Sequence, residues 1–132
     1  MKRNVTVFAL AGILLFGVAA FAHHSIGAAY DQSKDARIDG KLVQFNFRNP
    51  HSFVTVDVTD ASGKVQRWVV EWGGAGALGG QGITRSTLKV GDQVTITGNP
   101  SRTSGLMRLK MNTLHRKSDG FGWGTRPGEV VD

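Results

Sequence analysis

Strict alternation of apolar and polar side chains over residues 52–59 is the feature that most constrains the fold of this chain. Val54, Val56 and Val58 share one face of the segment, and Thr55 lies on the other. A period of two is that of a β-strand with one buried face. The segment therefore predicts a half-buried strand in a β-rich fold.

Four further segments carry a similar signal. We expect strands over residues 37–47, 65–72, 93–98 and 106–115, separated by turn residues such as glycine, proline, asparagine and aspartate. Three strands thus precede a glycine-rich stretch and two follow it. This is the order of an OB-fold, a small five-stranded Greek-key barrel. The sequence predicts an all-β, OB-like barrel, with another small barrel or a sandwich as the alternative.

The first expected strand changes phase along its length. Ile38, Gly40 and Leu42 share one face, after which Val43 and Phe45 continue on the other phase. A phase change within a strand indicates a β-bulge or a bend. Such a bend lets one strand serve both halves of a small barrel.

A glycine-rich stretch connects the third and fourth strands. Residues 73–82 contain six glycines, too many for regular structure throughout. We expect the one short helical turn of the fold just after it, at residues 84–88, with Thr84 as its N-cap.

The first 22 residues have the composition of an export signal. Lys2 and Arg3 form a basic start, apolar residues fill positions 5–21, and Ala20 and Ala22 make a small-x-small cleavage site. We expect cleavage after Ala22 and no stable membrane insertion afterwards. The mature protein is then periplasmic or secreted.

The expected organisation is a signal peptide at 1–22, an irregular arm at 23–36, the OB-like barrel at 37–115 and a flexible tail at 116–132. Loss of 22 of the 132 residues leaves 110, enough for one modest core. Because two basic residues leave with the signal, the net charge falls from +6 to +4, which does not indicate a nucleic-acid partner. The chain has no cysteine, so disulfides and thiolate metal sites are excluded.

Four short motifs are spread over most of the mature domain: Ala22-His23-His24-Ser25, Asn49-Pro50-His51, Trp68-Val69-Val70-Glu71 and Leu88-Lys89-Val90-Gly91-Asp92-Gln93-Val94-Thr95-Ile96-Thr97-Gly98. As a set they resemble a family of small exported bacterial proteins of unknown function. The resemblance implies export and a small β-barrel. It implies no catalytic residue.

Histidines follow the expected cleavage site directly. Cleavage after Ala22 would give His23 a free α-amine beside its imidazole, which is a bidentate unit for one metal ion. Nitrogen ligands of this kind suit copper(II). His24 is an alternative or supporting ligand, and His51, in the loop after the first strand, is the expected third. The sequence predicts a copper site of these three histidines, unless they are only accessible polar or turn residues.

Other functions stay open at this point. Glu71 either forms an ordinary salt bridge or orients a histidine. No catalytic constellation is evident, so we expect a binding protein rather than an enzyme, with a small copper redox enzyme as a further alternative. A metal-independent module would instead bind a small anionic ligand or a partner on a cationic rim of the barrel. The rim residues are Arg102, Arg108, Lys110, Arg116 and Lys117.

Overall fold

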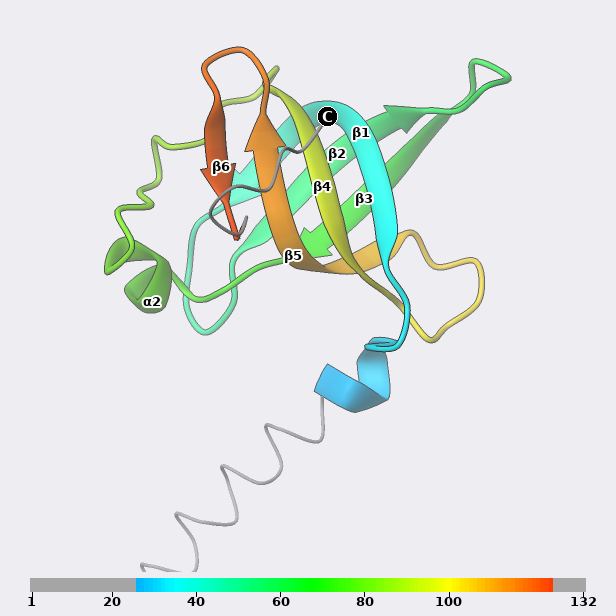
Figure 1. Cartoon of the computed structure of the whole chain (residues 1–132), viewed down its shortest axis with the longest axis horizontal. Helices are drawn as coiled ribbons and strands as arrows, with labels where there is room; N and C mark the ends of the chain where they lie inside the picture. The colour runs from blue at the N-terminus through cyan, green and yellow to red at the C-terminus, as the bar shows by residue number, and fades with distance from the viewer. Residues whose placement is uncertain (1–25, 125–132) are drawn as a thin grey trace, which may run out of the picture.

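The computed structural model describes residues 26–124, which form a closed five-stranded barrel with one further strand (Figure 1). The sheet order is β3-β2-β1-β4-β5-β6, and a parallel β3–β5 pairing closes the barrel. This connectivity confirms the predicted OB-like class. The elements are β1 (Ala36–Asn46), β2 (Phe53–Thr59), β3 (Val65–Glu71), α2 (Ala75–Gly79), β4 (Gln93–Pro100), β5 (Arg108–Arg116) and β6 (Phe121–Trp123).

The β1 strand bends where the sequence changes phase. Its first half pairs with β4 and its second half with β2, and the register shifts between Leu42 and Gln44. The predicted bulge is therefore confirmed. Gly40 lies near the point where β1 changes its partner from β4 to β2, and an added side chain there would collide with the backbone carbonyl of Asp57.

The core lies inside the barrel and is made by the inward faces of the strands. The valines and isoleucines predicted to face inward on β2 and β4 are buried or half-buried. Met107 differs from its predicted inward position, because it lies before β5 and is only half-buried. The buried core residues are Ile38, Leu42, Val54, Val56, Val70, Trp72, Leu78, Ile83, Leu88, Val94, Ile96, Leu109, Met111 and Leu114.

The helix is not where the sequence predicted it. It lies inside the glycine-rich stretch, as α2, whereas residues 84–88 form turns. Leu78 explains the helix, since its side chain is buried in the core and its burial stabilises a turn that glycines alone would not form. In the predicted segment, the Thr84 N–H donates to the Thr87 hydroxyl at 2.8 Å, a local bond of the kind that competes with helix formation.

Two segments outside the expected barrel are ordered. Residues 26–29 of the expected irregular arm form a helical turn, and Tyr30 after them is buried. Within the expected flexible tail, β6 pairs with β5, and Trp123 packs on Trp72 with ring centroids 5.1 Å apart. Both corrections have one physical cause, because an aromatic ring gains free energy by packing against the barrel.

Within residues 26–124 no helix is long and apolar enough to cross a membrane.

Candidate functional site

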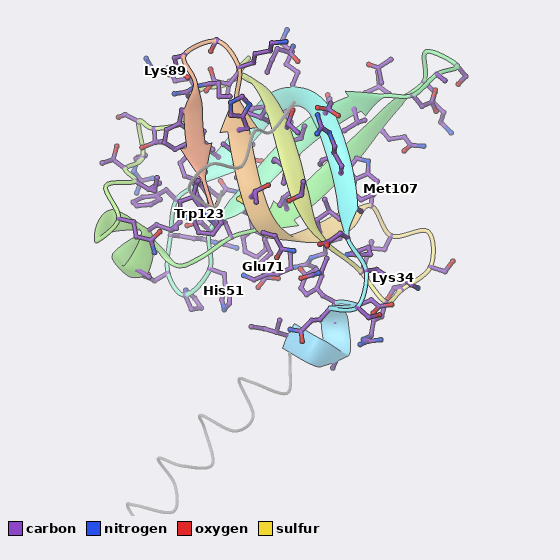
Figure 2. The ribbon with its side chains drawn as sticks, in the orientation of Figure 1. Lys34, His51, Glu71, Lys89, Met107 and Trp123 are labelled. Atoms are coloured by element: carbon purple, nitrogen blue, oxygen red, sulfur yellow. The ribbon has the colours of Figure 1, made fainter. Side chains whose placement is uncertain are left out.

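His51 lies in the loop between β1 and β2, and this loop is bonded to the segment that leads into α2. Ser52 is fully buried, and its hydroxyl bonds to the loop backbone. Its N–H donates to the Gly73 carbonyl at 2.9 Å, and the Gly76 N–H donates to Oδ1 of Asn49 at 3.0 Å. These bonds fix the loop at the end of the barrel where Glu71 also lies (Figure 2).

Glu71 is a buried carboxylate at the end of β3. Its Oε1 lies 2.8 Å from Nδ1 of His51, and its Oε2 accepts a hydrogen bond from the Tyr30 hydroxyl. Arg108 Nη2 lies 3.7 Å from Oε2. The two roles considered for Glu71 from sequence, a salt bridge and a contact with a histidine, are therefore combined in one side chain.

The contact with Glu71 determines which imidazole nitrogen of His51 faces outward. Nδ1 is buried against the carboxylate at ion-pair distance, without the angle of an aligned hydrogen bond. Nε2 has no hydrogen-bond partner within the part of the chain that the structure describes, and the side chain is 38% exposed. A carboxylate on one nitrogen with the other nitrogen open is the arrangement that orients metal-binding histidines.

Tyr30 joins the N-terminal arm to the same carboxylate. Burial first, and then the hydrogen bond to Glu71, raise the pKa of Tyr30 to about 12, so its hydroxyl is a neutral donor at neutral pH. The arm is also held by the Arg102 side chain, whose Nε donates to the Gly27 carbonyl at 2.8 Å. The arm is thus anchored beside the candidate site.

Two arginines lie over the ring of Phe53 in the pocket that contains His51. The guanidinium carbons of Arg48 and Arg108 are 5.3 and 5.7 Å from the ring centroid. Arg108 also donates from Nε to the Tyr30 hydroxyl at 2.9 Å. Arg48 is exposed and makes no ion pair with any residue of the 26–124 range.

One of the three predicted copper ligands can be placed. His51 lines the pocket, whereas His23 and His24 lie outside the described residues. Among residues 26–124, no group of three or more histidines and carboxylates is arranged to hold a metal ion. The three-histidine copper site therefore stays a prediction.

The basic residues predicted to form one cationic rim differ from one another in their surroundings. Arg116 is held by Asp92 at 2.6 Å and by Asp119 at 2.8 Å, so its charge is neutralised. Burial lowers the pKa of Lys110. Of the predicted rim, Arg108 is the residue that lines the pocket around His51.

Sequence reasoning did not single out Tyr30, Arg48 or Phe53 as site residues. Tyr30 offered one signal, because it is the largest apolar residue of the arm. Arg48 offered another, because it directly precedes the Asn49-Pro50 turn. Neither signal indicates which distant residues the side chain meets.

The barrel places this protein in the class of small OB-like β-barrels. The sequence profile of a family of unknown function, DUF6152, matches residues 11–109, and the chain belongs to that family. The match confirms the resemblance to an uncharacterised family. No curated protein matches the chain.

Proposed function

We propose that this chain is an exported OB-like binding module that holds copper, with His51 as the ligand from the barrel and His23 and His24 as further ligands. The observation that carries the proposal is the contact between Glu71 and Nδ1 of His51, which leaves Nε2 for a metal. A carboxylate in this position orients the imidazole and raises its basicity as a ligand.

In this proposal the arm brings its histidines to His51 from its attachment at Tyr30. Tyr30 follows His23 by seven positions and is bonded to the carboxylate that His51 contacts. Residues 26–29 form a helical turn, so residues 23–25 would supply the extended part of the reach, at most about 10 Å. Cleavage after Ala22 would add a free amine to the imidazoles of His23 and His51, and three such nitrogens suit copper(II).

Neutral nitrogen ligands, rather than charge attraction, would supply the affinity. Arg48 and Arg108 line the pocket and repel a cation, and Glu71 compensates for one of them. An α-amine has an ordinary pKa near 8 and must lose its proton to bind metal. Copper affinity is therefore expected to rise as the pH increases through this range.

A copper(II) titration of the mature protein tests the proposal. Protein exported through its own signal, with the mature mass checked, is titrated by calorimetry beside His23→Ala, His51→Ala and Glu71→Gln. We expect one tight equivalent in the wild type and at least a tenfold loss of affinity in both alanine variants. The loss in Glu71→Gln should be about 10- to 100-fold. His115→Ala is the control and should bind as the wild type does.

The spin-resonance spectrum of the one-equivalent complex gives a second measurement. It should change in His51→Ala, because one nitrogen ligand is lost. Copper binding that is indifferent to His51 would contradict the proposal and indicate a chelating N-terminus that acts without the barrel. Oxygen consumption with a reductant, above that of free copper, would instead favour the redox enzyme.

A further inference from the structure

An open groove lies beside the His51 pocket and shares two arginines with it. Phe53 and Val69 line it from β2 and β3, and Leu106 and Met107 line it from the β4–β5 loop (Figure 2 labels Met107). Its volume is about 440 Å³, within the range of small-molecule sites. Within residues 26–124, none of its lining side chains is acidic.

The charge of this groove comes from Arg48 and Arg108. The guanidinium carbons lie 5.3 and 5.7 Å from the centroid of the Phe53 ring, and this aromatic contact leaves their charge in place. The Arg108 side chain is 39% exposed, and Glu71, its one carboxylate neighbour within residues 26–124, is 3.7 Å away and also contacts His51. Arg48 has no carboxylate neighbour among the residues placed by the structure. The groove therefore keeps positive charge available to a ligand.

Apolar side chains line the same groove as these two arginines. Leu106 is 50% exposed, and a lone exposed leucine is ordinary on a protein surface. Here, however, it lines the same groove as the half-buried side chains of Phe53, Val69 and Met107. Two cationic groups beside an apolar wall fit a ligand that combines an acidic group with an apolar body.

We propose that this groove binds a small amphiphilic organic anion. Arg48 and Arg108 would bind its carboxylate or phosphate, because guanidinium groups match both acids with paired hydrogen bonds. Phe53, Leu106 and Met107 would contact its apolar body. No copper ligand takes part, so the inference is independent of the proposed metal site.

Displacement of anilinonaphthalene sulfonate, a fluorescent amphiphilic anion, from the mature protein tests this proposal. The competitors are octanoate, octyl phosphate and the uncharged octanol. We expect at least one of the anions to displace the probe at a concentration tenfold or more below that of octanol. The relative potency of octanoate and octyl phosphate in displacing the probe shows whether the groove prefers a carboxylate or a phosphate. Failure of both, or equal potency of octanol, overturns the proposal.

Variants assign the binding to named side chains. Arg48→Gln should weaken binding of the preferred anion at least tenfold, and Leu106→Ser should weaken it severalfold. Arg85→Gln is the matched control, since it removes the same charge from an exposed residue before β4 and should change nothing. An equal loss in the two arginine variants overturns the proposal, because it would reflect net charge alone.

The same variants separate this site from the copper site. His51→Ala should lose copper affinity and keep its affinity for the anion within about twofold. Arg48→Gln should lose the anion and bind copper at least as tightly as the wild type, because it removes a charge that repels the cation. Each proposal can therefore fail while the other stands. Loss of anion binding in His51→Ala alone would contradict the assignment of anion binding to the groove.

Discussion

Glu71 is the side chain on which the candidate site depends. Burying a carboxylate costs free energy unless hydrogen bonds and opposite charge replace its water. Tyr30 supplies a hydrogen bond, Arg108 a positive charge and His51 an imidazole nitrogen. One residue of β3 thereby positions side chains from the arm, from β5 and from the β1–β2 loop.

Tyr30→Phe should remove a loss of stability that the wild-type protein shows at alkaline pH. The pKa of Tyr30 in the folded protein, about 12, lies above its ordinary value of 10.0, chiefly because the hydroxyl is buried. Its contribution to the free energy of unfolding is therefore complete below pH 10 and is lost as the pH rises toward 12. Urea unfolding over this range should show a loss roughly 2 kcal/mol larger in the wild type than in the variant. Parallel profiles would contradict the raised pKa.

At the scale of elements, the β1–β2 loop and the segment before α2 act as one unit. The Ala75 N–H donates to the Arg48 carbonyl at 3.0 Å. Gly74 lies so close to this loop that an added Cβ would meet the Pro50 carbonyl, and would stand 2.8 Å from Oδ1 of Asn49. Glycine at this position is what allows the loop to approach and to hold His51 in place.

Gly74→Ala should displace the loop and the histidine with it. We expect a loss of about 1–3 kcal/mol in the free energy of unfolding, because the new methyl group overlaps backbone atoms. Gly79→Ala in α2 is the control, since nothing lies within 4 Å of its added Cβ, and it should be neutral or slightly stabilising. Thermal unfolding of the two variants checks this, and equal melting temperatures would contradict the close packing at Gly74.

At the scale of the whole molecule, barrel closure assembles the site. The parallel pairing of β3 with β5 places Glu71 opposite Lys110, next to Arg108. Beyond the barrel, β6 extends the sheet, and Nε1 of Trp123 donates to Oε1 of Gln81 at 2.7 Å. Segments before and after the five strands therefore contribute to one packed unit.

Trp123→Ala should destabilise the entire barrel by about 1–3 kcal/mol, because the contact with Trp72 and the bond to Gln81 are both lost. Trp123→Phe keeps an aromatic ring on Trp72 and should recover most of this loss. Urea unfolding followed by tryptophan fluorescence measures both variants. Wild-type stability in Trp123→Ala would mean that β6 adds nothing to the barrel.

Much of the fold could be predicted because the sequence patterns that indicate its strands are local. Alternation along each strand depends on neighbours two residues apart, and so the strands and the bulge after Leu42 follow from the sequence. The helix was misplaced because Leu78 forms it by entering a core assembled from distant strands. His51 was recognisable as a candidate because it follows a proline turn.

The sequence by itself therefore determined the strand pattern, the order typical of an OB barrel and one histidine of the candidate site. Only the tertiary structure decided what surrounds that histidine. Tyr30 and Glu71 are 41 positions apart, and Arg108 is 78 positions from Tyr30, so no local pattern relates them. They meet because the barrel closes between β3 and β5 while the arm docks across its end, and that juxtaposition depends on packing of the whole chain.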